Sequence, residues 1–240
     1  MSIKVAVVGA TGRMGKMALE LIDAAQDLTL HSALDSKSEL SQTLGADVIF
    51  DVTRFEVSQQ IVTHAIANNQ KVLVGTSGWT AQHLQQIESQ LRGTDAAVVV
   101  VPNFSVGSML GSKFAAEAAK FFDSIEIVEA HHAGKIDSPS GTAVRTAEMI
   151  SAARDGKSIL LPGVGQGARG QVVAGVPIHS LRLEGVSAKQ EVLLGGESEV
   201  LKIAHEVTSI RSYVTGILKS LRFTADAKGL TVGLQSVLGL

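Results

Sequence analysis

The sequence predicts an α/β protein, in which an N-terminal doubly wound parallel sheet is followed by a smaller α+β unit with an open mixed sheet. Between residues 3 and 101, short apolar runs alternate with stretches of helical periodicity. A glycine-rich turn directly follows the first of these runs. After residue 104 the alternation stops and β-rich segments follow one another. These observations separate a nucleotide-binding type of domain from a second, different one.

The apolar runs of the first part are expected to be strands, because they are rich in Val, Ile, Leu and Ala. They comprise residues 3–8, 28–34, 46–52, 71–74 and 96–101. Apolar residues at helical spacing lie between them, for example around Ile61 and Ile87. Strands that alternate with helices imply parallel crossovers, so the sheet should be buried on both faces. A mean hydropathy of +0.25 agrees with such a core.

The second part is expected to be an α+β domain. Helices are expected at 106–122 and from 142 to 150, a strand at 125–129, a long glycine-rich loop at 155–175, and consecutive antiparallel strands at 178–184, 187–194 and 200–205. The helix from Tyr213 leads to a last segment that should pack back onto the first part. The expected domains are therefore 1–104 with 216–240, and 105–215.

Composition excludes several classes of function. With 21 basic and 23 acidic residues the net charge is −2, which argues against sequence-independent binding of nucleic acid. Cysteine is absent, which excludes disulfides and thiolate chemistry. No apolar run approaches the roughly 20 residues of a membrane helix, and the first residues lack a signal-peptide pattern. A cytoplasmic protein that binds neither membrane nor nucleic acid is expected, with its open sheet covered by self-association.

The glycine-rich turn has the pattern G-x-x-G-x-x-G at the start of the first helix. Its residues are Gly9, Ala10, Thr11, Gly12, Arg13, Met14 and Gly15. Glycines there allow a tight turn and let the backbone approach a pyrophosphate, whose charge the helix N-terminus favours. The pattern alone would also suit a plain turn without a ligand. Its place between a strand and a helix favours a dinucleotide site of the Rossmann type.

Asp35 lies twenty residues beyond Gly15, at the end of the second strand, where a carboxylate can bind the ribose hydroxyls of a dinucleotide. A carboxylate there favours NADH, whereas Arg13 and Lys37 could neutralise the additional phosphate of NADPH, so either cofactor is possible. Two later strand ends are expected to receive the nicotinamide half, with ordinary turns as the alternative. Their residues are Gly75, Thr76 and Ser77, and Val101, Pro102, Asn103 and Phe104.

The segment 129–143 gathers the residues with the most distinctive chemistry. Ser140, Gly141 and Thr142 open a helix, and could bind a carboxylate or simply cap the helix. His131 and Lys135 could exchange protons with a substrate, although solvated surface residues would look the same. Because His131 and His132 are neighbours on a strand, their rings should point to opposite faces, and no metal site is expected.

The same segment resembles the signature E-x-H-H-x-x-K-x-D-x-P-S-G-T-A of the dihydrodipicolinate reductase family. The matching residues are Glu129, His131, His132, Lys135, Asp137, Pro139, Ser140, Gly141, Thr142 and Ala143. The resemblance continues through Gly12–Gly15, the Gly75 loop, Pro102–Phe104, Val176–Ser180 with Arg182, Arg211–Tyr213 and Gly229–Leu230. It therefore covers essentially the whole chain.

This resemblance implies an NAD(P)H-dependent reductase of diaminopimelate and lysine biosynthesis that acts on a small dicarboxylate, and a homotetramer. By position, it makes His131 a proton donor or acceptor and Lys135 a second proton donor. The substrate-binding residues it implies are His132, Ser140, Gly141 and Thr142. The glycine turn, Asp35, residues 75–77 and residues 101–104 become the NADH or NADPH site.

The chain departs from the family pattern at a few positions. Gly134 stands where many relatives have a polar residue, Arg54-Phe55 replaces a His-Pro-like pair, and Ser77 replaces a threonine. The first two leave open the cofactor preference and the efficiency of the enzyme. Another imine or carbonyl reductase, and a nucleotide sensor without catalysis, are alternative functions. A sensor should have a damaged His-Lys segment, and this segment is intact.

Overall fold

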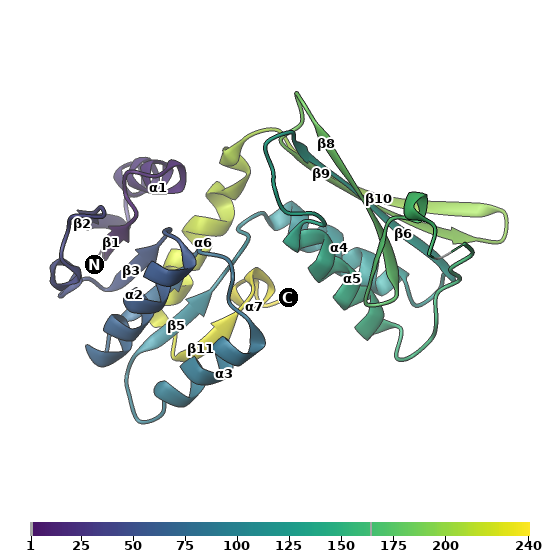
Figure 1. Ribbon diagram of the computed structural model, residues 1–240. Coiled ribbons are helices and arrows are strands. Elements are labelled where there is room, and N and C mark those ends of the chain that lie inside the picture. Colours follow the sequence, from purple (N-terminus) through teal and green to yellow (C-terminus); the bar gives the residue numbers. More distant parts are fainter. Residues whose placement is uncertain (1, 164) are drawn as a thin grey trace. The chain divides into compact units, whose positions relative to one another are not determined.

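The computed structural model describes residues 2–163 and 165–240. The chain divides into two compact units, Met1–Phe104 together with Tyr213–Leu240, and Ser105–Ser212. Figure 1 shows the first unit in purple, blue and yellow and the second in teal and green. Each unit has its own sheet and its own core. Within the described residues, no helix has both the length and the apolar character needed to cross a membrane.

The first unit is a six-stranded sheet in the order β11-β5-β4-β3-β1-β2, with all neighbours parallel. Its strands are β1 (Ile3–Val8), β2 (Leu28–Leu34), β3 (Val48–Asp51), β4 (Lys71–Val74), β5 (Ala97–Val100) and β11 (Gly229–Val232). Its helices are α1 (Arg13–Ala24), α2 (Phe55–Ala67), α3 (Ala81–Gln90), α6 (Val214–Asp226) and α7 (Leu234–Leu238), with a 3-10 turn at Leu40–Thr43. The predicted doubly wound parallel sheet is confirmed.

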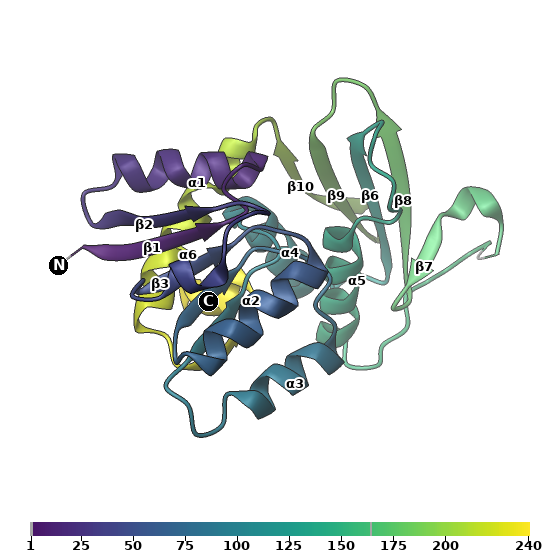
Figure 2. The same cartoon turned by 60° about the vertical axis from the view of Figure 1, so that its left-hand side comes forward.

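Helices cover both faces of this sheet (Figure 2). Helices α2 and α3 bury Ile61 and Ile87 against strand residues such as Val72 and Val98. Strand side chains alternate, so the residues between these point to the opposite face, where α1 and α6 contact each other. Because all strands are parallel, the turns that follow β1, β2, β3, β4 and β5 lie at one edge of the sheet, which is where such folds bind ligands.

The second unit has a five-stranded sheet in the order β10-β9-β6-β8-β7, and its helices α4 and α5 contact each other. The strands are β6 (Ser124–His132), β7 (Gln171–Val173), β8 (Val176–Leu183), β9 (Ala188–Gly196) and β10 (Glu199–Val207). The helices are α4 (Val106–Ala118) and α5 (Gly141–Ala153), with 3-10 turns at Gly167–Arg169 and Ile210–Tyr213. The helices and the sheet share a core that includes Ile125, Ile127 and Ile150. The predicted open mixed sheet is confirmed.

The pairing of this sheet differs from the expected succession of strands. Strand β8 does not pair with β9; β6 lies between them, parallel to β8 and antiparallel to β9. Ile125 and Ile127 of β6 are fully buried, and the central position gives this strand a partner on each side. In addition, β7 forms within the stretch 155–175 that was expected to be a loop, and β6 continues to His132 instead of ending at Glu129.

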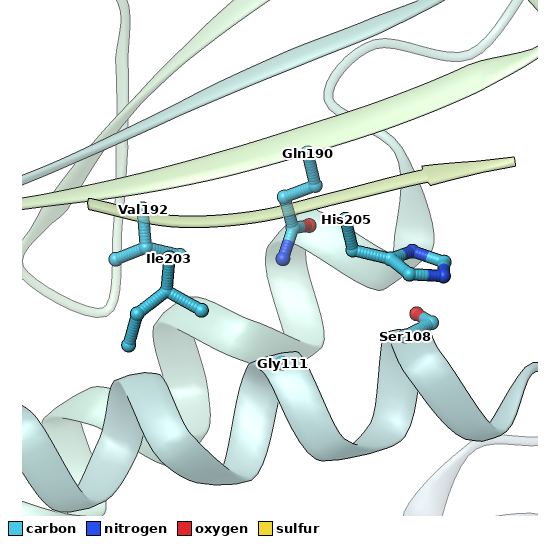
Figure 3. Close-up of a pocket in the computed structure, with 6 residues that line it drawn as sticks. All are labelled: Ser108, Gly111, Gln190, Val192, Ile203 and His205. Atoms are coloured by element: carbon cyan, nitrogen blue, oxygen red, sulfur yellow. The ribbon is translucent and has the colours of Figure 1, made fainter.

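A small cavity of about 10 Å³ lies in the second unit, between α4 and the strands β9 and β10 (Figure 3). Its lining residues are Ser108, Gly111, Gln190, Val192, Ile203 and His205. A Cβ atom on Gly107 would lie 2.6 Å from the His205 ring, so glycine lets the ring fit beside the helix. Burial lowers the pKa of His205. The cavity has room for about one water molecule, and a dicarboxylate cannot enter it.

Candidate functional site

The turn between β1 and α1 needs glycine for steric reasons. Gly9 has a φ of +92°, and a Cβ atom there would lie 2.7 Å from the Val52 carbonyl oxygen. A Cβ atom on Gly15 would collide with the Gly9 carbonyl oxygen. Helix α1 can therefore pack close to the end of β1 only because these residues lack side chains.

The N-terminus of α1 is suited to bind an anion. Gly12 precedes the helix, its amide donates to the Gly9 carbonyl (3.0 Å), and among the described residues no side chain caps it. The first turn contains no acidic residue, so the amides of Arg13 and Met14 face no local carboxylate. Free amides at the positive end of a helix dipole are the usual partners of a pyrophosphate.

Asp35 follows β2 at the same edge of the sheet and is exposed. Its Oδ1 accepts hydrogen bonds from the Lys37 amide and the Ser38 hydroxyl, both 2.9 Å long. These bonds, the Lys37 amide foremost, lower the pKa of Asp35, so the group is a carboxylate at neutral pH. An exposed carboxylate held in this way can accept hydrogen bonds from ribose hydroxyls.

The turns after β4 and β5 lie against each other. A Cβ atom on Gly75 would lie 2.9 Å from the Phe104 ring, and the Val101 amide donates to the Val74 carbonyl (2.8 Å). The side chains of Val101 and Phe104 are buried, and the Phe104 ring meets Phe50 edge to face at 5.7 Å. These two predicted cofactor residues therefore have only their backbone available to a ligand.

Asp51, at the end of β3, is a buried residue to which the sequence analysis gave no role. Its carboxylate accepts from the Ser58 hydroxyl, the Thr53 hydroxyl (2.6 Å) and the Thr53 amide (3.0 Å). Burial raises the pKa of Asp51 in spite of these bonds. The Thr53 amide also donates to the buried Thr76 hydroxyl (3.1 Å). Asp51 and Thr76 thus hold the β3–α2 and β4–α3 turns together, and Thr76 serves this turn rather than facing solvent.

In the second unit, the predicted catalytic segment runs from β6 to the start of α5. Glu129 of β6 is fully buried, and both of its carboxylate oxygens accept hydrogen bonds. Its Oε2 accepts from His131 Nδ1 (2.6 Å) and from one Arg182 guanidinium nitrogen (3.0 Å). Its Oε1 accepts from the other guanidinium nitrogen (3.1 Å) and from the Ser140 amide (3.2 Å).

The charge of Glu129 is stabilised by these partners. Burial acts to raise the pKa of Glu129, but hydrogen bonds from Arg182 and His131 outweigh it, and the pKa lies below its ordinary value. Arg182 comes from β8, where it stands opposite His131 in the parallel register. Sequence reasoning gave neither Glu129 nor Arg182 a role. The spacing of Glu129 and His131 put them on one face of a strand, but the β6–β8 register was not predictable.

Lys135 lies in the loop after β6 and has a carboxylate bound to it. Its ammonium group is 2.6 and 2.7 Å from the two oxygens of Asp137. This ion pair lowers the pKa of Asp137. The loop itself is held by Arg182, which donates to the carbonyls of Lys135 (3.3 Å) and Asp137 (2.5 Å).

Helix α5 begins beside this loop. The Ser140 hydroxyl caps the helix by accepting from the Ala143 amide (3.2 Å), and Ser140 is buried. Since its amide is bonded to Glu129, Ser140 supports the site rather than offering a free hydroxyl. At Gly141 a Cβ atom would meet no atom within 4 Å, and the first turn has no acidic residue. A carboxylate can therefore approach the helix N-terminus at Gly141 and Thr142.

The structure thus brings together most of the residues predicted in this segment. His131, Lys135 and Ser140 are connected through Glu129 and Arg182. His132 is exposed, and strand alternation turns its side chain to the other face from His131, so it lies outside this cluster. Among the described residues, no group of three or more His, Asp or Glu side chains could hold a metal ion.

A larger cavity of about 300 Å³ occurs in the first unit. It is lined by residues such as Asp47, Asn68 and Lys71, at the amino ends of β3 and β4. The glycine turn and Asp35 lie at the opposite, carboxyl ends of the strands. Its side chains already have partners, because Asp47 accepts from the Lys4 amide and Lys71 donates to the Ala225 carbonyl. We therefore assign the dinucleotide to the carboxyl edge and not to this cavity.

Comparison with known proteins agrees with this geometry. Residues 3–104 match the family model "Dihydrodipicolinate reductase, N-terminus", and residues 107–238 match "Dihydrodipicolinate reductase, C-terminus". The chain is 52% identical to the 4-hydroxy-tetrahydrodipicolinate reductase of Clavibacter michiganensis, over 100% of this chain and 87% of that protein. It is 43% identical to that of Cutibacterium acnes, over 99% of both chains.

A solved structure is similar over the same length. It is the dipicolinate-bound dihydrodipicolinate reductase from Paenisporosarcina sp. TG-14, with a TM-score of 0.82 and 32% identity, over 98% of this chain and 99% of that one. The family resemblance found in the sequence is therefore confirmed by sequence and by fold.

Proposed function

Because this chain belongs to the dihydrodipicolinate reductase family, we propose that it reduces 4-hydroxy-tetrahydrodipicolinate to tetrahydrodipicolinate with NADH or NADPH. The reaction belongs to the synthesis of diaminopimelate and lysine, as the names of the relatives imply. The observation that carries the proposal is the cluster of His131, Lys135 and the α5 N-terminus around Glu129 and Arg182. Its cationic and amide groups suit a small dicarboxylate.

The residues of the first unit fit the dinucleotide. The uncapped N-terminus of α1 would bind the pyrophosphate and Asp35 the ribose hydroxyls. Backbone groups of residues 75–77 and 101–104 line the expected place of the nicotinamide half, since they follow neighbouring strands. When bound, the cofactor supplies the hydride that is added to a carbon atom of the substrate.

The residues of the second unit would bind the acceptor and supply the proton. One substrate carboxylate would pair with Lys135, where Asp137 now lies, and the other would accept from the amides at Gly141 and Thr142. His131, whose Nδ1 is bonded to Glu129, presents Nε2 as the proton donor or acceptor. Lys135 is the second candidate donor. The reaction balances when a hydride and a proton are added and the 4-hydroxyl group of the substrate is lost as water.

Steady-state kinetics with each nucleotide tests this function. We expect oxidation of NADH or NADPH to depend on freshly prepared 4-hydroxy-tetrahydrodipicolinate, with no comparable rate for simple 2-oxo acids. Faster turnover of a 2-oxo acid or another imine would assign the chain to a different reductase reaction. Binding of nucleotide without turnover of any of these compounds would indicate a sensor.

We further propose a homotetramer that works in the cytoplasm. The sheet of the second unit carries exposed apolar side chains, including Leu181 and Leu183, which a neighbouring subunit could cover. Light scattering should show a tetramer for the natural protein and smaller species for Leu183→Glu. Phe121→Glu is the control, because Phe121 is 83% exposed but lies outside the strands. A cysteine-free chain suits a reducing compartment.

A further inference from the structure

We propose that Glu129 is a positioning residue that orients both proton-transferring side chains: His131 by a direct hydrogen bond, and Lys135 through Arg182. The inference rests on the proposed function and adds a role for Glu129 and Arg182. Glu129 is fully buried at the end of β6, whereas both ends of the arrangement, His131 and Lys135, are partly exposed.

The first branch of the arrangement concerns the tautomer of His131. Glu129 is ionised, and a carboxylate can only accept a hydrogen bond, so His131 Nδ1 must carry the proton that bridges the 2.6 Å contact. The neutral ring then has its lone pair on Nε2, the nitrogen that is left for the substrate. The carboxylate also stabilises the imidazolium form, from which a proton can be donated.

The second branch concerns the loop that carries Lys135. Arg182 lies flat against Glu129 with two bonds of 3.0 and 3.1 Å, a bidentate arrangement that fixes the guanidinium plane. Arg182 also donates to the carbonyls of Lys135 and Asp137 in the loop, and to the carbonyl of Leu181 on its own strand. The backbone position of Lys135 therefore depends on a guanidinium that Glu129 orients.

The charged groups around His131 come from its own strand, from β8 and from the following loop. Glu129 is on the same strand, Arg182 on β8, and Lys135 with Asp137 on the loop, while β9 places the uncharged Ala188 opposite His131 and the uncharged Ser140 caps α5. The Glu129 carboxylate binds both His131 and Arg182, and Arg182 in turn binds the loop that carries Lys135. Removal of the Glu129 charge should therefore act on His131 and Lys135 together.

The same strand offers a matched control. Glu126 also binds one arginine and one histidine, Arg169 and His179, the latter at 2.6 Å. It lies three residues before Glu129, on the opposite face of β6, and its partners have no predicted catalytic role. Glu126→Gln removes the same charge from the same strand without altering the proposed cluster.

The first experiment measures the tautomer and does not depend on activity. In ¹⁵N-histidine NMR of the full chain, we expect neutral His131 to be protonated on Nδ1, and Glu129→Gln to move the proton toward Nε2. Glu126→Gln should leave the His131 signals unchanged. An Nε2-protonated ring in the natural protein would overturn the proposal, even if the enzyme proved to be a reductase.

The second experiment measures the reaction. For Glu129→Gln we expect a loss of roughly 100-fold in kcat, a value typical of misplaced catalytic groups. The Kd for NADH should stay within about twofold, so that the loss appears in kcat and not in cofactor binding. Glu126→Gln should keep the natural kcat, once light scattering shows an unchanged mass.

A conservative variant covers the case in which Glu129→Gln does not fold. Glu129→Asp keeps the negative charge opposite Arg182 but withdraws the carboxylate by one methylene group, so it should fold, and retain NADH binding with a lower kcat. A kcat equal to that of the natural protein in either variant would overturn the positioning role. Absence of activity in the natural protein would instead overturn the proposed function, while the tautomer result would still stand.

Discussion

At the scale of single residues, Lys135 is already engaged by an anion. Both oxygens of Asp137 lie within 2.7 Å of its ammonium group, although Asp137 is largely exposed. An exposed ion pair of this kind contributes little to stability. A substrate carboxylate can therefore take its place beside Lys135 at small cost, which makes Lys135 the most direct target for mutation.

Lys135→Ala should reduce kcat by orders of magnitude and leave the Kd for NADH within about twofold, because the lysine lies in the second unit and the dinucleotide residues lie in the first. Steady-state kinetics measures kcat, and titration calorimetry measures the Kd for NADH. Lys120→Ala is the control, since Lys120 forms an exposed ion pair with Glu117 on the outside of α4. An equal loss of NADH binding would contradict this division between the units.

Asp35→Ala should weaken NADH more than NADPH. In the proposed site the ionised carboxylate would accept hydrogen bonds from the ribose hydroxyls of NADH and would repel the additional phosphate of NADPH. Fluorescence titration with both nucleotides gives the two Kd values, and Asp23→Ala, an exposed change on α1, is the control. If both affinities fall equally, Asp35 has no ribose role.

At the scale of elements, the contact of α1 with β1 depends on glycine. Gly15→Ala would force a methyl group into the Gly9 carbonyl oxygen and within 2.7 Å of the Ala10 Cα atom. We expect loss of dinucleotide binding and destabilisation by about 1–3 kcal/mol, as for an overpacked core. Thermal unfolding and NADH titration measure both effects. Gly167→Ala, where a Cβ atom meets nothing within 4 Å, should leave them unchanged.

The elements also show what could be predicted from the sequence. Strands β1, β2 and β4 have the expected bounds, because continuous apolar runs next to glycine turns leave few other conformations. Strand β6 was expected at 125–129 but continues to His132, and its place between β8 and β9 was not predicted, since pairing depends on which faces become buried. For the same reason Arg182, which meets Glu129 only through the β6–β8 register, could not be found.

At the scale of the whole molecule, carboxylates that have lowered pKa values should make the fold sensitive to acid. Glu126 and Glu129, whose ordinary pKa is 4.5, are held below that value in the fold by their arginine and histidine partners, against the opposing effect of burial. The unfolded chain therefore takes up protons first as the pH falls. Their contribution is complete above about pH 4.5 and is lost as the pH falls through the folded pKa.

Urea unfolding across a pH series checks this sign. The urea concentration at the unfolding midpoint should decrease as the pH is lowered from about 5 to about 3. Glu126→Gln should make this decrease less steep. Asp51 acts in the other direction, since burial raises its pKa. The cost of burying its charge is therefore removed when Asp51 is protonated at low pH. A midpoint that stays constant or rises toward pH 3 would show that Asp51 outweighs the paired glutamates.

The first unit is assembled from two distant stretches of chain. Strand β11 completes its sheet beside β5, and α6 contacts β3, β4 and β5, yet all of the second unit is synthesised between these partners. On the ribosome, β5 therefore remains at an open edge of the sheet until residue 232 has left the exit tunnel. The second unit can reach its final form during translation, whereas the sheet of the first unit is completed last.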